Sequence, residues 1–168
     1  MTETESRPAP AATLPPPSAG TLVRVLVAGA VATAAFDLFG QALSPMAGFA
    51  RLAPVPLATQ TWGVVFGESY GPGGHLLHYV AGLVAYPLGW LAVWEPLRRR
   101  VAPRIGWGAS AALYGVGLWV FALFFMAHLV AGNPPFLDFT GITWVALAGH
   151  VLFALVAAVT MRYRLVRG

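Results

Sequence analysis

The chain has 168 residues, of which 58% are hydrophobic and only 10% are charged, and its mean hydropathy is +0.70. A soluble domain carries about 25% charged residues, so this composition indicates an integral membrane protein in a lipid bilayer. The sequence contains no cysteine, which excludes disulfides, thiolate metal sites and cysteine nucleophiles. All ten basic residues are arginines, and most of them flank apolar segments, a pattern that argues against a nucleic-acid partner.

The first twenty residues form a distinct segment. Residues 1–20 are polar, contain five prolines and show no apolar periodicity. Such a segment cannot bury enough apolar surface to order itself, so we expect a disordered cytoplasmic tail. Its start is acidic, at Glu3 and Glu5, where a signal peptide would be basic. Residues 21–168 are predicted to form one transmembrane domain.

Four apolar runs are long enough to cross about 30 Å of hydrocarbon as helices. They are approximately Leu22–Leu43, His75–Glu95, Trp107–Ala131 and Gly141–Met161. The predicted fold is therefore an all-α, integral membrane four-helix bundle. Glycine recurs within the runs, for example at Gly115 and Gly117, which favours close contact between helices. Pro87 should kink the second predicted helix.

The arginines predict the orientation of this bundle. Nine of the ten belong to the two termini or to the connection between the second and third runs: Arg7, Arg24, Arg98, Arg99, Arg100, Arg104, Arg162, Arg164 and Arg167. Only Arg51 falls on the opposite side. Because basic residues are enriched on the cytoplasmic side, both termini should face the cytoplasm. Glu95, beside these arginines, is expected to form an ion pair with them.

The connections on the outer side are unequal. Residues 44–74 form a long connection rich in proline and glycine. Its middle, Leu57 to Phe66, is apolar enough to lie on the outer membrane surface as a short interfacial helix. Residues 132–140 form a short turn on the same side.

The side chains able to carry chemistry gather in the outer half of the predicted bundle. At 1.5 Å per residue, Asp37 lies about 9 Å and His150 about 13 Å inside the outer boundary. His78 and His128 lie about 5 Å inside it, and His75 lies at the boundary itself. Because polar groups are costly in lipid, each should face the interior of the bundle.

Helical spacing adds supporting polar residues to this group. Thr33, Asp37 and Gln41 are spaced four apart, so they form a polar stripe on the first predicted helix. His75 and His78, three apart, share a face of the second. We therefore expect Asp37, His78 and His150 to form one site, in a pocket beneath the long outer connection.

Several interpretations of this His/Asp cluster are open. Imidazole and carboxylate groups are suitable ligands for zinc, copper or iron, so Asp37, His78, His128 and His150 are candidate metal ligands. His78 and His128, at matching depths on different helices, are candidate axial ligands of a haem iron. A proton relay through Asp37 and His150 is a further alternative. The plainest interpretation is structural, with interhelical hydrogen bonds that fix the packing.

These interpretations correspond to different classes of function. A small membrane protein with an outer-half His/Asp site, either structural or binding a metal or haem, is the leading hypothesis. The alternatives are an oligomeric transporter or proton-conducting component, and an accessory subunit of a larger membrane complex. No Ser/His/Asp set, phosphate loop or pair of carboxylates stands out, so the sequence does not indicate catalysis.

Three short motifs resemble a family of small bacterial four-helix inner-membrane proteins that has no assigned activity. They are Ala32-Thr33 followed by Asp37, His78-Tyr79 followed by Gly82, and Gly149-His150 with Phe153. The resemblance extends over most of the chain after the tail, although His128 and the long outer connection have no counterpart. It implies the four-helix fold and a multi-pass location in the bacterial cytoplasmic membrane, and it implies no activity.

Overall fold

The computed structural model describes residues 18–166, with side chains as far as Tyr163. Within this range the chain is helical, with short connections and no strand. The predicted disordered tail lies outside the described residues except for its last three positions. There Ser18 caps the first helix, because its side chain accepts a hydrogen bond from the N–H of Thr21. This cap explains why the helix begins three residues before the predicted Leu22.

Four helices among the described residues are long and apolar enough to cross a membrane. They are helix 1 (Ala19–Met46), helix 2 (Gly71–Val101), helix 3 (Trp107–Val130) and helix 4 (Gly141–Tyr163). Each coincides with one of the four predicted runs, so the prediction of an all-α chain with four helices of membrane-spanning length is confirmed.

Three of the four helices change between α and π hydrogen bonding along their length. Helix 1 consists of α1 (Ala19–Asp37), η1 (Leu38–Leu43) and α2 (Ser44–Met46). Helix 2 consists of α4 (Gly71–Val80), η2 (Ala81–Ala85), α5 (Tyr86–Gly89), η3 (Trp90–Trp94) and α6 (Glu95–Val101). Helix 3 consists of α7 (Trp107–Val120) and η4 (Phe121–Val130), whereas helix 4 is the continuous α8 (Gly141–Val166).

The π-helical segments of helix 2 flank the position of Pro87. Proline has no N–H, so the carbonyl four residues earlier loses its usual donor. The N–H of Tyr86, directly before Pro87, donates to the carbonyl of Ala81, five residues earlier, as in a π-helix. The kink at Pro87 stays a prediction.

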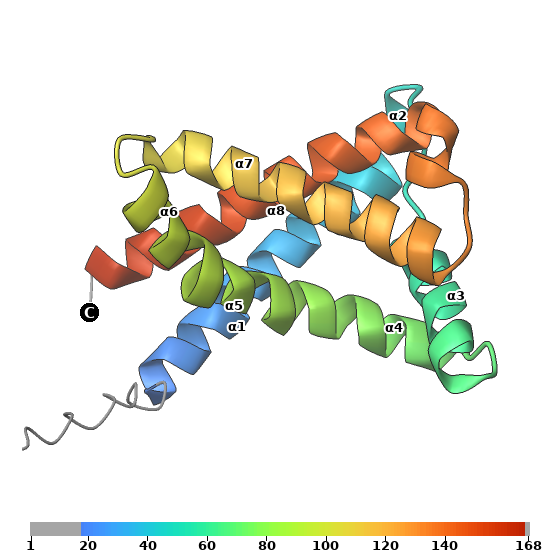
Figure 1. The fold of residues 1–168 in the computed structure, drawn as a ribbon, viewed down its shortest axis with the longest axis horizontal. Helices are drawn as coiled ribbons and strands as arrows, with labels where there is room; N and C mark the ends of the chain where they lie inside the picture. Colours follow the sequence, from blue (N-terminus) through green and yellow to red (C-terminus); the bar gives the residue numbers. More distant parts are fainter. Residues whose placement is uncertain (1–17, 167–168) are drawn as a thin grey trace, which may run out of the picture.

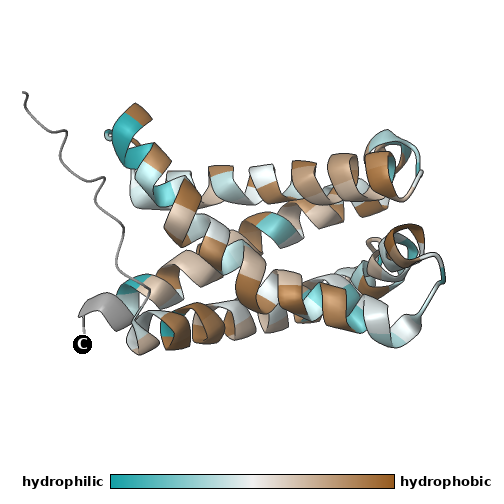
Figure 2. Ribbon diagram, turned by 60° about the horizontal axis from the view of Figure 1, so that its bottom comes forward, coloured by the Kyte–Doolittle hydropathy of each residue, from teal (hydrophilic) through white to brown (hydrophobic). Residues whose placement is uncertain are grey.

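The two ends of the bundle differ in composition (Figure 1). The start of α1, α6 and the end of α8 lie at one end, which carries most of the described arginines and is called the arginine end below. The opposite end, the loop end, holds α2, α3 (Pro54–Phe66) and the turn η5 (Pro135–Phe139). Figure 2 shows hydrophobic residues recurring along the helices between the two ends.

Close helix contacts depend on two glycines. Helix 1 packs on helix 2 and helix 4, and helix 3 packs on helix 4. A Cβ at Gly29 would collide with the backbone of Leu83, and a Cβ at Gly115 would lie 2.6 Å from Cα of Val151. The backbones therefore approach where no side chain separates them. Gly117, by contrast, faces open space, so its predicted role in helix contact is wrong.

Helices 2 and 3 meet towards the arginine end. The indole Nε1 of Trp94 donates to Ser110 Oγ at 2.9 Å, and the hydroxyl of Tyr114 donates to the carbonyl of Tyr86 at 2.6 Å. The rings of Trp90 and Tyr114 pack edge to face, with centroids 5.5 Å apart. These contacts fill the space between the two helices at this end.

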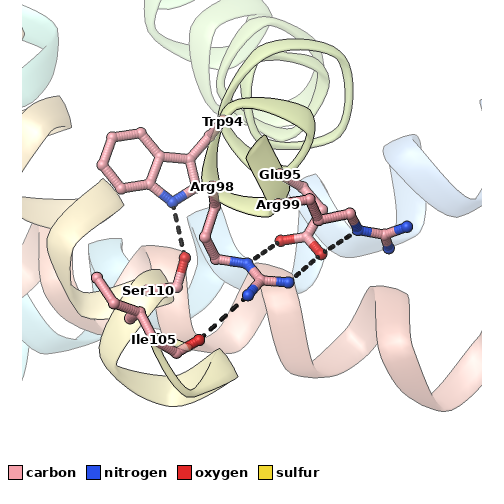
Figure 3. Close-up of polar contacts among 6 residues, drawn as sticks. All are labelled: Trp94, Glu95, Arg98, Arg99, Ile105 and Ser110. Atoms are coloured by element: carbon pink, nitrogen blue, oxygen red, sulfur yellow. Dashed lines mark hydrogen bonds and ion pairs between the residues drawn. The ribbon is translucent and has the colours of Figure 1, made fainter. Parts of the chain in front are cut away.

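The predicted ion pair of Glu95 is confirmed (Figure 3). The guanidinium of Arg98 binds the carboxylate of Glu95 through two bonds of 2.8 Å, and Arg99 Nε lies 2.9 Å from the same carboxylate. Arg98 also donates to the carbonyl of Ile105 at 3.1 Å, which ties α6 to the turn that precedes helix 3. The connection between helices 2 and 3 is thereby fixed by charge-assisted hydrogen bonds.

At the loop end, α3 lies across helix 2. The apolar stretch Leu57–Phe66 is helical as predicted, and the helix begins three residues earlier, with proline in its first turn. Its side chains pack closely on α4, because a Cβ at Gly73 would collide with Trp62 and one at Gly74 would collide with Thr59. A hydrogen bond of 3.1 Å from Asn133 Nδ2 to Gln60 Oε1 joins the end of helix 3 to α3.

Candidate functional site

A cavity of about 460 Å³ lies at the loop end, between helices 2 and 3. Residues of α1 and α8 form one of its walls, and α3 covers it. The cavity forms because helices 2 and 3 are in contact at one end only. Towards the arginine end they meet through aromatic side chains. At the loop end α3 packs on both α4 and η4 and holds the two helices apart. The walls are mainly apolar and include the aromatic rings of Phe36, Tyr86, Phe121 and Phe153.

His78 lies on the cavity wall and forms a hydrogen bond with Asp37. Its Nε2 is 3.2 Å from Oδ1 and 3.3 Å from Oδ2 of the carboxylate. Gln41 donates to the same Oδ1 at 2.8 Å, so the predicted polar stripe of helix 1 is partly joined into one network. A carboxylate only accepts hydrogen bonds, so the hydrogen of the His78 contact resides on Nε2. Asp37 and Gln41 do not themselves line the cavity.

His150 also lies on the cavity wall and is 7% exposed. Its Nδ1 is 2.7 Å from the carbonyl oxygen of Ala146, one turn earlier in the same helix. A carbonyl can only accept, so Nδ1 carries the hydrogen and Nε2 of the neutral ring keeps its lone pair. Nε2 has no hydrogen-bond partner within residues 18–166. The ring therefore presents an acceptor for an additional donor.

Thr33 supplies a hydroxyl that is unsatisfied within the described part of the chain. The residue is 4% exposed and lines the cavity, and its Oγ1 has no hydrogen-bond partner there. Threonines in helices usually donate to the carbonyl four residues earlier, as Thr61 and Thr160 do here at 3.1 and 2.8 Å. A buried hydroxyl without a partner costs about 1–3 kcal/mol, so Thr33 is an exception that needs an explanation.

The Phe36 ring packs against both cavity histidines. Its centroid is 5.1 Å from that of His150 and 6.5 Å from that of His78. The sequence predicts Asp37, His78 and His150 as one site, but the structure joins only Asp37 and His78 by hydrogen bonds. His150 shares the cavity with His78 and is linked to it through this phenyl ring.

The two remaining histidines lie elsewhere. His128 does not line the cavity, because its Nδ1 donates to the carbonyl of Asn133 at 2.7 Å and so caps the end of helix 3. His75 is exposed, and its ring stacks on that of Tyr79 with centroids 6.3 Å apart. Neither residue contributes to the cavity wall.

The predicted metal ligands are not assembled as a set, whereas axial ligation of a haem iron by His78 and His128 stays a prediction. Between Ser18 and Val166, no group of three or more His, Asp or Glu side chains is arranged to hold a metal ion. The physical reason is the position of helix 3, whose His128 is directed to its own C-terminal turn.

Sequence reasoning missed several residues of the site. Phe36 and the aromatic walls carry no signal that distinguishes them from other apolar residues of a membrane helix. Gln60 and Asn133, which line the cavity and bind each other, do carry one, because Gln60 is an uncharged polar residue within the apolar stretch Leu57–Phe66 and Asn133 is one that closely follows the third apolar run. Leu52 is 5% exposed, and its N–H donates to the carbonyl of Gly40 at 2.9 Å.

No family model, curated protein or solved structure matches this chain. The chemistry of the cavity is therefore inferred from its own residues.

Proposed function

We propose that the chain is an integral membrane protein that binds a lipid-soluble small molecule in the cavity between helices 2 and 3. The observation that carries this proposal is the cavity itself. Its volume of about 460 Å³ falls in the range of about 300–1,000 Å³ that is usual for small-molecule sites. Apolar walls with a few polar groups are also the usual composition of such sites.

Access from the surrounding lipid supports the same proposal. Val80 of helix 2 and Phe121 of helix 3 both line the cavity, yet they are 46% and 43% exposed. We infer from their exposure that the cavity opens to the lipid between these two apolar residues. A molecule dissolved in the bilayer would enter here without passing through water.

The arrangement of helices 2 and 3 favours binding over conduction by a single copy. A conducting path would have to continue from the cavity to the arginine end. Trp90, Trp94 and Tyr114 fill the space between the helices there and are hydrogen-bonded or packed edge to face. A ligand would therefore be held at the loop end and leave by the opening through which it entered.

The proposed orientation places the arginine end in the cytoplasm and the cavity in the outer leaflet. It is supported by the distribution of the arginines along the sequence, of which only Arg51 falls in the connection between helices 1 and 2 or that between helices 3 and 4. The resemblance to small bacterial inner-membrane proteins adds the proposal that this membrane is the bacterial cytoplasmic membrane. In this orientation α3 lies at the outer surface of the membrane, over the bound molecule.

The proposal is tested by identifying compounds that co-purify with the protein. The variant Ala122→Phe places a large ring in the cavity, since Ala122 lines it, and Ala148→Phe adds the same ring at an exposed position of helix 4. Native mass spectrometry and analysis of extracts should find a lipid-soluble compound with the wild type and Ala148→Phe that is depleted from Ala122→Phe. Identical compounds in equal amounts from all three proteins would contradict the proposal.

A further inference from the structure

We infer that the molecule bound in this cavity is uncharged and donates a hydrogen bond to Nε2 of His150. The inference rests on the proposed function and specifies its ligand as a lipid-soluble compound with an O–H or N–H group. Two observations carry it: the place of the imidazole on the cavity wall, and the hydrogen bond that leaves one of its two nitrogens free.

The face of helix 4 that carries His150 borders the cavity. The residues of this helix that line the cavity are Ile142, Ala146, His150 and Phe153, each three or four positions after the one before. Residues with this spacing share one face of a helix. The side chain of His150 therefore leaves the helix on the cavity side, where the residue is only 7% exposed.

The bond at Nδ1 determines which nitrogen of the ring is directed away from the helix. Nδ1 is attached to the ring carbon that joins Cβ, and it lies 2.7 Å from the carbonyl oxygen of Ala146 in the same helix. Nε2 is at the far end of the ring. Among the described residues, Thr33 Oγ1 is the only fully buried side-chain nitrogen or oxygen without a hydrogen-bond partner. Nε2 of His150 also lacks a partner, so it is not fully buried and borders open space.

The protonation of the ring specifies what Nε2 can bind. Because Nδ1–H is donated to a carbonyl, Nε2 of the neutral ring can only accept. The cavity wall, as far as the structure describes it, contains no Asp, Glu, Lys or Arg, so a charged ligand would have no opposite charge there. A ketone, an ether or an ester offers no hydrogen to this nitrogen. The group that satisfies it is therefore a neutral hydroxyl or N–H.

The surroundings of His150 favour an aromatic body on this ligand. The Phe36 ring packs edge to face against the imidazole, with centroids 5.1 Å apart. Tyr86, Phe121 and Phe153 line the same cavity. Because aromatic rings pack favourably edge to face or offset against one another, flat aromatic compounds are suitable probes of the site.

The test compares aromatic probes with and without the donated hydrogen. We would titrate the wild-type protein in lipid nanodiscs with 2-naphthol and its methyl ether, and with carbazole and 9-methylcarbazole, and subtract the partition of each probe into empty nanodiscs. In at least one pair, we expect the unmethylated probe to bind about tenfold more tightly, which is about the contribution of one hydrogen bond. The pair that shows the preference identifies the donor as O–H or N–H.

Variants assign this preference to His150. His150→Leu removes both ring nitrogens, and His150→Asn keeps a donor near the position of Nδ1 but is too short to place an acceptor at that of Nε2. Both should abolish the preference. His75→Leu makes the same change at an exposed histidine outside the cavity and should retain it. Binding of the methylated probes, which donate no hydrogen bond to residue 150, shows that each variant is folded.

The outcomes separate this inference from the proposed function. Equal affinity of the wild type for both members of each pair would overturn the inference and leave the proposed binding function standing. A preference that persists in His150→Leu and His150→Asn, or one that His75→Leu also abolishes, would overturn it as well. Binding of none of the four probes to the wild type would contradict the proposed function and, with it, the inference.

Discussion

The imidazole of His78 faces the carboxylate of Asp37, with Nε2 at 3.2 Å from Oδ1, although the two residues are 41 positions apart. Both are only partly accessible, with 12% of the His78 side chain and 22% of the Asp37 side chain exposed. A carboxylate is costly in a membrane unless it has partners. Here His78 and Gln41 supply them, so the pair joins helix 1 to helix 2 directly beside the cavity.

This contact predicts coupled stabilities. In a double-mutant cycle of Asp37→Leu and His78→Leu, we expect the double variant to lose about 1 kcal/mol less than the sum of the single variants. The control cycle of Asp37→Leu and His150→Leu should be close to additive, because the hydrogen bond of His150 is to Ala146. Unfolding by sodium dodecyl sulfate in mixed micelles measures both. Additivity in the first cycle would show that the His78–Asp37 contact does not stabilise the fold.

The close packing of helices 3 and 4 predicts opposite effects at two neighbouring glycines. Gly115→Ala should lower the free energy of unfolding by about 1–3 kcal/mol, because the new methyl group would meet the backbone of Val151 and force the helices apart. Gly117→Ala faces open space and should be neutral or slightly stabilising, since alanine favours helix. Thermal denaturation in mild detergent compares the two. Equal loss of stability would mean that the helices are not in contact at Gly115.

The turn between helices 3 and 4 predicts an unusual preference for glycine. Phe136, Leu137, Asp138 and Phe139 all have φ between 50° and 56°, a left-handed conformation that is costly for residues with a side chain. Among them Asp138 is exposed, so its side chain can be changed without loss of core packing. Asp138→Gly should be more stable than Asp138→Ala by about 1 kcal/mol, measured by the same denaturation. If alanine were the better residue, this segment would not be left-handed.

The orientation predicts the result of reporter fusions. A reporter attached after Gly168 should be active only if it functions in the cytoplasm, because nine of ten arginines are predicted to lie on that side. A reporter inserted after Gly67, in the exposed turn between α3 and helix 2, should be active only if it functions outside the cytoplasm. The opposite pattern at both positions would reverse the proposed orientation and place the cavity in the inner leaflet.

The amino-acid sequence by itself determined the secondary structure to within a few residues. Helices of membrane-spanning length can be predicted from local hydrophobicity, because the thickness of a bilayer sets how many consecutive apolar residues a helix needs to cross it. The helical segment within Leu57–Phe66 and the ion pair of Glu95 with Arg98 were predictable for a similar reason, since each depends on residues close together in the chain. The errors at the starts of helices arise from Ser18 and from prolines in first turns, whereas helix 2 also continues beyond the predicted Glu95 through α6.

The tertiary structure alone decided which polar groups share a site. Depth in the membrane follows from position in a helix, but the direction of a side chain within the bundle depends on how the helices pack. Contact of Gly29 with Leu83 and of Gly115 with Val151 fixes helices 1 and 4 between helices 2 and 3, and α3 keeps the latter two apart. That arrangement brings His78 to Asp37, leaves Thr33 without a hydrogen-bond partner among the described residues, and directs His128 away from the cavity. Such contacts between distant segments have no counterpart in local hydrophobic patterns, so the sequence could not predict them.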